Sequence, residues 1–224
     1  ASAARSATSS ALPQGMRADV VADALKAGEF VPGLRALLVA RHCALVAERL
    51  ALALAEKPGV PTVWMDTPSW PNHAQICADL GLGMKNFSHA GADGSADMDA
   101  LRAAIAEAAE GDCFLLHGCC HNPTGIDYSN ADWDEIAGLI AAKKLLPLLD
   151  LAYQGLGAGM EEDAYGLRRV LAAVPEAIVA YSCDKNFGLY RDRTGALYVM
   201  MAEPGQLKAA MSNGHALARA NWSQ

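Results

Sequence analysis

Chemically versatile side chains follow several short apolar runs of this sequence. They comprise a lysine, an aspartate, a tyrosine, an asparagine, an arginine and a tryptophan: Lys185, Asp150, Tyr153, Asn122, Arg193 and Trp70. A lysine amine can form a Schiff base with a carbonyl compound, an aspartate can keep a pyridine nitrogen protonated, and an arginine can bind a phosphate through two hydrogen bonds. Together these residue types indicate a planar, phosphorylated and electron-withdrawing cofactor.

The apolar runs before these residues read as buried β-strands. They are continuous rather than alternating, which is typical of strands covered on both faces. The predicted strands are 61–66, 84–88, 113–117, 145–150, 177–182 and 196–201. Segments of helical composition separate them, at 72–80, 98–110, 130–144, 163–173 and 204–219. This alternation predicts a three-layer α/β/α fold with a mostly parallel central sheet, whose ligand site lies where the strands end.

The first third of the chain has a different character. Segment 36–56 is rich in helix formers and apolar almost all round, which predicts a buried helix. Residues 1–15 are rich in alanine and serine and contain no acid. We expect a disordered tail there, and an organelle transit peptide is the alternative.

Composition excludes several classes of protein. With 52% hydrophobic residues the 224-residue chain can bury one large core or two small ones. The net charge of −7 opposes binding to nucleic acid or anionic lipid, and no apolar run approaches the roughly 20 residues of a membrane span. Six cysteines are too few for a disulfide-dense secreted scaffold. We therefore expect a cytoplasmic protein without nucleic-acid or membrane partners.

Four stretches resemble the pyridoxal 5'-phosphate (PLP) aminotransferases of fold type I, in the branch of aspartate and aromatic amino acid transaminases. They are LLHGCCHNPTG at 115–125, LLDLAYQGLGAGMEEDAY at 148–165, YSCDKNFGLYRDRTGAL at 181–197 and RANWSQ at 219–224. The resemblance covers roughly residues 61–224, with matching order and spacing. It implies the large domain of such an enzyme and PLP as its cofactor.

The resemblance assigns catalytic roles to three residues. Lys185 is implied to form the Schiff base with PLP and then to move a proton at the substrate Cα. Asp150 is implied to pair with the pyridinium nitrogen, and Tyr153 to donate to the phenolate oxygen of the cofactor. Asn122 is implied to contact the same oxygen and the substrate, and a cis peptide is expected before Pro123. Outside these motifs, such residues are more often surface lysines, helix caps or core aromatics.

Further roles follow from the same resemblance. Trp70 is implied to stack on the cofactor ring, and His73 to support the ring-binding aspartate. Ser182 and Arg193 are implied phosphate ligands. Arg219 is implied to receive the distal carboxylate of a dicarboxylic substrate in the site of a second subunit, so the resemblance implies a homodimer. A salt-bridged surface arginine is the alternative for Arg219.

The sequence departs from the family pattern around the phosphate. Residues 39–45 read VARHCAL where the family has a glycine-rich turn, so the backbone cannot adopt the same turn without strain. We hypothesise that Arg41 or His42 replaces the lost donors. The carboxylate of Asp184 would repel a phosphate unless it pairs with Arg41 or Arg193.

The departures also concern domain organisation. The family segment that closes over substrate is not recognisable in residues 1–35, and the small domain with the arginine for the substrate α-carboxylate is not found. We expect an N-terminal tail and divergent segment at 1–35 and a PLP-binding large domain at 36–224.

Other kinds of site have weaker support. His117, Cys119, Cys120 and His121 could form a metal cluster, but the following Asn-Pro-Thr-Gly prevents a helix that would place both histidines on one face, so no metal is expected. The glycines of 155–159 are a weak dinucleotide signal, and no G-x-S-x-G elbow supports a hydrolase.

The sequence therefore predicts an aminotransferase. It would move an amino group between aspartate, glutamate or an aromatic amino acid and a 2-oxo acid. The alternative is a truncated, non-catalytic remnant that serves dimerisation or binding.

Overall fold

The computed structural model describes residues 35–39, 62–191 and 195–221, with the backbone alone described at 35–39 and 217–221. Within these residues, seven strands form one sheet in the order β1-β7-β6-β5-β4-β2-β3. The strands are β1 Arg35–Val39, β2 Val63–Thr67, β3 Met84–Ser88, β4 Cys113–His117, β5 Leu146–Leu151, β6 Ala177–Ser182 and β7 Gly195–Met200.

The sheet is mostly parallel. Strands β6, β5, β4, β2 and β3 run parallel to their neighbours, whereas β7 is antiparallel to both β6 and β1. The carboxyl ends of the five parallel strands therefore meet at one edge of the sheet. The predicted α/β class with a mostly parallel sheet is confirmed.

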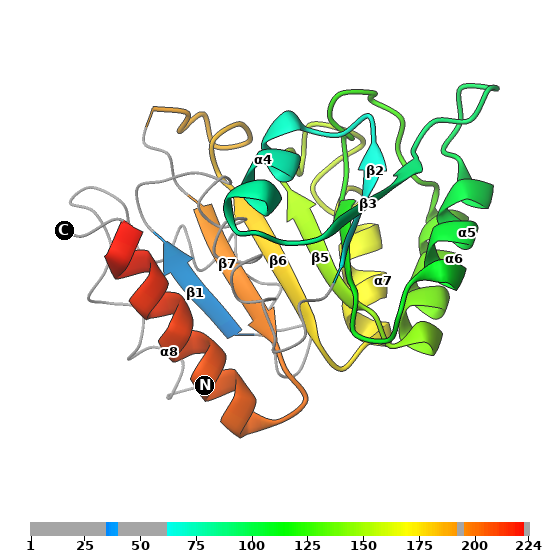
Figure 1. The fold of residues 1–224 in the computed structure, drawn as a ribbon. Coiled ribbons are helices and arrows are strands. Elements are labelled where there is room, and N and C mark those ends of the chain that lie inside the picture. The colour runs from blue at the N-terminus through cyan, green and yellow to red at the C-terminus, as the bar shows by residue number, and fades with distance from the viewer. Residues whose placement is uncertain (1–34, 40–61, 192–194, 222–224) are drawn as a thin grey trace.

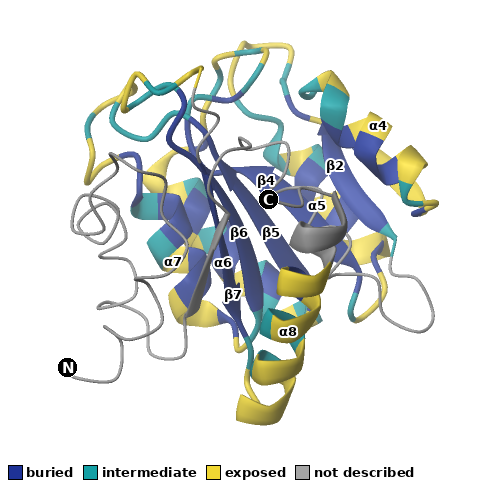
Figure 2. Cartoon of the chain, turned by 90° about the vertical axis from the view of Figure 1, so that its left-hand side faces the viewer, coloured by how far each residue is buried: buried dark blue, intermediate teal, exposed yellow. Residues whose placement is uncertain are grey.

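Helices cover both faces of this sheet (Figure 1). They are α4 Pro71–Asp79, α5 Met98–Glu107, α6 Asn130–Lys143, α7 Tyr165–Ala173 and α8 Pro204–Asn221. The core cluster on one face includes side chains of α5, α6 and α7, and the cluster on the other face includes side chains of α4 and α8. Figure 2 shows the buried strands between α6 and α7 on one side and α4 and α8 on the other, which gives the three predicted layers.

Local sequence explains where several helices begin. At α6, Ser129 and Asp132 form a capping box, in which each side chain accepts from the backbone N–H of the other residue. At α5, the Asp97 side chain accepts from the Ala100 N–H. Helix α4 begins with Pro71, whose missing N–H costs nothing at the first helical position.

Strand β4 shows why the sequences of the central strands are continuously apolar. All five of its residues are buried, and Phe114, Leu115 and Leu116 have no exposed surface. Side chains of a strand alternate between faces, so Phe114 and Leu116 join one core cluster and Leu115 the other.

Two expectations about single elements were wrong. The predicted helix at 36–56 begins in a strand, because residues 36–39 belong to β1 and pair with β7, and residues 40–56 lie outside the described residues. A short apolar run suits a buried strand as well as a buried helix. Strand β3 is not buried on both faces, since among its residues Phe87 alone is buried. It is an edge strand of the described sheet, and the exposed Lys85 is typical of an edge that resists pairing with another chain.

No helix in the described part of the chain combines the length and the apolar character that crossing a membrane requires.

Candidate functional site

The predicted site residues lie at the carboxyl edge of the parallel strands. His117 ends β4, Asp150 is the fifth residue of β5, and Ser182 ends β6. In the sheet register His117 pairs with Asp150, and Asp150 pairs with Ala180 of β6. The topology thus brings together three segments that are distant in the sequence.

Asp150 is buried and contacts a histidine of α4. The His73 Nε2 lies 3.4 Å from Asp150 Oδ2, and the His73 Nδ1 lies 3.1 Å from the Ser69 hydroxyl. The Trp70 ring meets His73 edge-on, with 5.3 Å between ring centroids. His73 therefore lies between Asp150 and the segment before α4, and the supporting role that the resemblance implies for it stays a prediction.

Lys185 lies in the loop after β6, beside two tyrosines. Its Nζ is 5.2 Å from the centre of the Tyr153 ring and 5.9 Å from that of Tyr190. The amide of Asn186 donates to the Gln154 carbonyl oxygen at 3.2 Å, which ties this loop to the one after β5. The structure thus brings Lys185 and Tyr153 together on two connected loops.

Asn122 lies in the loop after β4, which internal hydrogen bonds fix. The Asn122-Pro123 peptide is cis, as expected from the sequence. The Asp127 carboxylate accepts from the N–H groups of Cys120 and His121, each at 2.8 Å. The Cys120 thiol lies 3.9 Å from the Tyr153 carbonyl oxygen, so this loop also contacts the one that carries Tyr153.

Ser182 and Asp184 are both buried at the end of β6. The Asp184 N–H donates to the Ser182 hydroxyl oxygen at 3.2 Å, which leaves the serine O–H as a donor. The predicted partners Arg41 and Arg193 lie outside the described residues, as do His42 and the rest of 40–45. Arg219 belongs to α8, where its side chain is not described.

Asp66 is a further buried carboxylate at this edge, and sequence reasoning gave it no role. Asp66 of β2 is surrounded by His89, His117 and His121, whose nearest nitrogens lie 3.5, 3.7 and 3.0 Å from its Oδ2. Burial raises the pKa of Asp66, but the three imidazoles lower it more, so the carboxylate is ionised. The sequence signal that could have identified Asp66 as a site residue is a charged residue near the end of an apolar strand.

The adjacent thiols of Cys119 and Cys120 lie close to the carboxylate of Asp163. That carboxylate accepts hydrogen bonds from several backbone N–H groups, and burial raises the pKa of both thiols. A carboxylate that already accepts hydrogen bonds is a poor metal ligand, and a raised thiol pKa disfavours the thiolate that would bind a metal ion. The expectation that no metal binds here stays a prediction.

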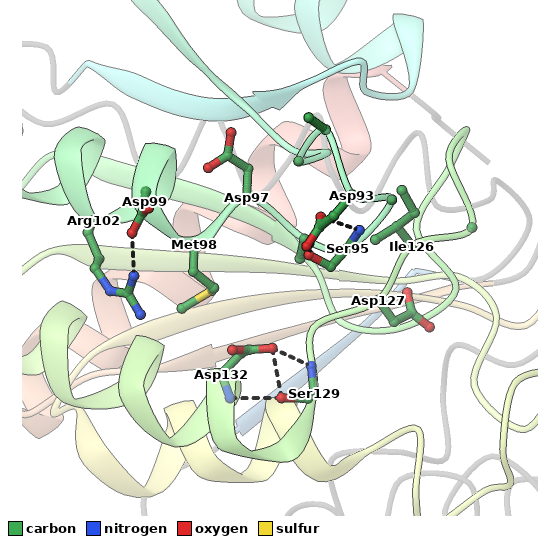
Figure 3. Close-up of a pocket in the computed structure, with 15 residues that line it drawn as sticks. Asp93, Ser95, Asp97, Met98, Asp99, Arg102, Ile126, Asp127, Ser129 and Asp132 are labelled. Carbon is green, nitrogen blue, oxygen red and sulfur yellow. Dashed lines mark hydrogen bonds and ion pairs between the residues drawn. The ribbon is translucent and has the colours of Figure 1, made fainter.

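An acidic hollow of about 920 Å³ lies beside the loop that holds Asn122 (Figure 3). Its carboxylates serve local structure: Asp132 caps α6, Asp97 caps α5, and Asp99 pairs with Arg102. These contacts explain the hollow as part of two helix starts and give it no separate chemistry.

Comparison with known proteins shows what the whole arrangement resembles. Residues 5–221 match the family model described as aminotransferase class I and II. Curated relatives include a tyrosine aminotransferase of Rhizobium meliloti, 46% identical over 176 residues, and an aspartate aminotransferase of Escherichia coli, 45% identical over 171 residues. These alignments cover 78% and 76% of this chain, but 45% and 43% of the two relatives.

Solved structures agree with this comparison. An aromatic amino acid aminotransferase with 3-indolepropionic acid has a TM-score of 0.82 and 39% identity, covering 88% of this chain and 51% of that one. An aromatic-amino-acid aminotransferase of Burkholderia pseudomallei, covalently bound to pyridoxal phosphate, has a TM-score of 0.85 and 29% identity, covering 95% and 55%. The chain thus spans about half the length of the proteins that it matches.

Proposed function

Because this chain belongs to the class I and II aminotransferase family, we propose that it binds PLP and serves transamination between an amino acid and a 2-oxo acid. The names of its relatives support aspartate or aromatic amino acids as the amino donors, and we include glutamate as the other acidic amino acid. The observation that carries the proposal is the meeting of Lys185 with Tyr153 at the same sheet edge as the buried Asp150.

The residues at this edge fit the cofactor chemically. Bound PLP supplies a ring that withdraws electrons and stabilises negative charge at the substrate Cα. Asp150 would hold the ring nitrogen, the Tyr153 hydroxyl would donate to the ring oxygen, and Trp70 would cover the ring face. Asn122 would contact the same oxygen and the substrate, and the Ser182 O–H would donate to the phosphate. Each group is of the chemical type that its target requires.

The lysine amine has two tasks in this proposal. Lys185 Nζ would hold the cofactor aldehyde until a substrate amine replaces it, and would then move a proton at the substrate Cα. The loop contacts of Asn186 with Gln154 keep this amine beside Tyr153. His73 would orient Asp150 throughout, since its Nε2 faces that carboxylate at 3.4 Å.

The proposal extends to residues and partners beyond the described site. Arg193 would bind the phosphate, and Arg219 would reach the substrate carboxylate in the site of a second copy. The protein would therefore act as a homodimer. We propose a cytoplasmic location for it, as expected from its composition. Exposed apolar side chains on the site loops, among them Tyr190 and Leu156, support such a partner surface.

The test is chemical labelling of the lysine. The chain is titrated with PLP, the absorbance of lysine-bound cofactor is followed, and the product is reduced with borohydride and mapped by peptide mass spectrometry. We expect the label on Lys185, and we expect Lys185→Ala to lose both band and label. Lys143→Ala is the matched control, because Lys143 ends α6 and bonds the Ala106 carbonyl, away from the site.

Two further observations distinguish an enzyme from a non-catalytic remnant. Adding aspartate or phenylalanine separately should change the spectrum of the bound cofactor, and the stronger response identifies the substrate class. Labelling of no lysine, or equal labelling in Lys185→Ala, would favour a non-catalytic remnant over an enzyme.

A further inference from the structure

Asp66 is the centre of a buried cluster of four titratable side chains, which we call the Asp66 cluster: Asp66, His89, His117 and His121. The Asp66 side chain has no exposed surface, and the three imidazoles come from the segments after β3 and at the end of β4. Within the described residues, every ion-pair partner of Asp66 is a histidine. A buried carboxylate is costly unless paired, so the protons of these rings decide its state.

His89 contacts both Asp66 and a backbone carbonyl group. Its Nε2 lies 2.7 Å from the Ile126 carbonyl oxygen, which can only accept, so this nitrogen carries a proton. Its Nδ1 lies 3.5 Å from Asp66 Oδ2. Burial lowers the pKa of His89, but the Asp66 carboxylate and the Ile126 carbonyl raise it more. Other titratable groups facing this ring are Asp127 and Tyr128, together with the rings of the cluster.

His121 is the histidine of the cluster that lies closest to Asp66. Its Nε2 lies 3.0 Å from Asp66 Oδ2 and its Nδ1 lies 2.8 Å from the Thr124 hydroxyl oxygen. Burial lowers the pKa of His121 more than the Asp66 carboxylate raises it, and the contact of Nε2 with that carboxylate lacks the geometry of a hydrogen bond. Asp66 therefore lies against the residue that precedes Asn122.

His117 connects Asp66 with Asp150. Strand β4 lies between β2 and β5, and His117 at its end faces one carboxylate with each nitrogen. Its Nδ1 is 3.7 Å from Asp66 Oδ2 and its Nε2 is 3.9 Å from Asp150 Oδ2. Neither contact is a hydrogen bond, but both carboxylates lie within 4 Å, and a neutral imidazole has one N–H, so the two negative charges favour opposite tautomers of the ring.

We propose that Asp66 is a positioning residue of the cofactor site, whose charge biases the tautomer of His117 and thereby the electrostatic environment of Asp150. This inference rests on the proposed function only in taking PLP as the molecule that Asp150 would contact. The positions of the protons on the histidine rings do not depend on the cofactor.

A shared metal ion is a poorer account of the cluster. Asp66, His89 and His121 offer ligand atoms within 4.8 Å of one another. The rings of His89 and His121, however, are stacked, with 3.5 Å between centroids and 8° between planes. Each ring nitrogen offers its lone pair in the plane of its own ring, and one ion cannot lie in two planes that are stacked face to face.

The first experiment reads the protons without cofactor. Long-range ¹H–¹⁵N spectra of histidine-labelled chain report the tautomer and charge of each imidazole. In Asp66→Asn we expect the tautomer balance of His117 to move toward the form with its proton on Nε2, facing Asp150, and the His89 ring to lose its charge at a lower pH than in the wild type. In His89→Gln we expect the balance to move toward Nδ1, because the charge of Asp66 then has one imidazole fewer beside it.

A matched control separates these effects from loss of packing. Asp112 is also a buried carboxylate, but it precedes β4 at the opposite edge and accepts from Trp64 Nε1 and two backbone N–H groups. Asp112→Asn should lower stability and leave the histidine spectra unchanged. Unchanged His117 and His89 signals in a folded Asp66→Asn would overturn the proposal. If Asp66→Asn does not fold, an unchanged His117 signal in His89→Gln would overturn it. So would a zinc titration of the wild-type chain that binds stoichiometrically at His89 and His121.

The second experiment adds PLP. The pH at which the spectrum of the bound cofactor changes should shift by about half a unit or more in Asp66→Asn and stay in place in Asp112→Asn. Absence of any bound-cofactor spectrum in the wild type contradicts the proposed function and leaves the histidine result standing. A normal wild-type spectrum with no shift in Asp66→Asn contradicts the role of Asp66.

Discussion

A single carboxylate holds the loop that follows Tyr153. Asp163 accepts hydrogen bonds from four backbone N–H groups: Gly155 at 2.8 Å, Gly157 at 2.9 Å, Ala158 at 2.8 Å and Gly159 at 3.4 Å. A Cβ at position 157 would lie 2.7 Å from the Asp163 Oδ1, so the loop closes tightly on the carboxylate. Burial raises the pKa of Asp163, but the four donors lower it more.

Replacing this carboxylate by an amide should weaken the loop in a pH-dependent way. We expect Asp163→Asn to lower the free energy of unfolding at pH 7 by about 1.5–3 kcal/mol, since these are hydrogen bonds to a charged group. Because the folded pKa is depressed, the stabilisation is present above the unfolded value of about 3.9 and is lost as pH falls through the folded pKa. Urea unfolding at pH 7 and at about pH 3 should show the gap between wild type and variant closing in acid.

Glu162→Gln is the control for this change, because Glu162 is exposed and adjacent in sequence. An equal loss of stability in Glu162→Gln, or a gap that is the same at both pH values, would contradict the role of Asp163.

At the residue scale, motif positions were easier to predict than the Asp66 cluster. Lys185, Asp150 and Tyr153 each follow or end a strand within a recognisable motif, and the structure brings Lys185 and Tyr153 together. Asp66 and His89 have no such motif. Their meeting depends on β2 lying between β3 and β4, which the spacing of residues along the chain does not reveal.

Helices α6 and α7 pack closely at one glycine. A Cβ at Gly166 would overlap the indole ring of Trp133, which lies buried on α6. A buried aromatic ring has little room to move, so an added methyl group forces the two helices apart. The close approach therefore depends on glycine at this position.

We expect Gly166→Ala to lower the free energy of unfolding by about 1–3 kcal/mol through overpacking. Gly138→Ala is the matched control, since Gly138 is an exposed residue of α6 with open space around a Cβ. It should raise stability by about 0.5–1 kcal/mol, because alanine is the better helix former. Urea unfolding measures both values, and effects of the same sign would contradict this account of the packing.

At the element scale, strand and helix types were mostly predictable where flanking signals exist. Strands 84–88, 113–117 and 177–182 have the predicted bounds, because turn residues or helix starts flank these apolar runs. Strand β1 was missed for the opposite reason. Its five residues continue into a long apolar segment with no break, and only pairing with β7 distinguishes it from a helix.

At the scale of the whole molecule, the loops of the carboxyl edge present apolar side chains to solvent. Large hydrophobic residues are 39–61% exposed at four positions there: Leu156, Met160, Phe187 and Tyr190. The contact of Asn186 with Gln154 joins the two loops that carry them. Clustered apolar exposure of this kind marks an interaction surface, whereas single exposed apolar residues are ordinary.

If these loops form the centre of the proposed homodimer, polar replacements there should dissociate it. Each buried apolar side chain contributes on the order of 1.5–3 kcal/mol. The double variant Leu156→Ser with Phe187→Ser should therefore raise the dimer dissociation constant by at least about tenfold. Sedimentation velocity over a range of concentrations measures this shift. Met84→Ser is the matched control, since Met84 is 41% exposed but lies on the edge strand β3. A monomeric wild-type chain, or a Met84→Ser variant that dissociates equally, would show that these loops do not join two copies. Arg219 of α8 could then not reach the site of a neighbouring copy through this surface.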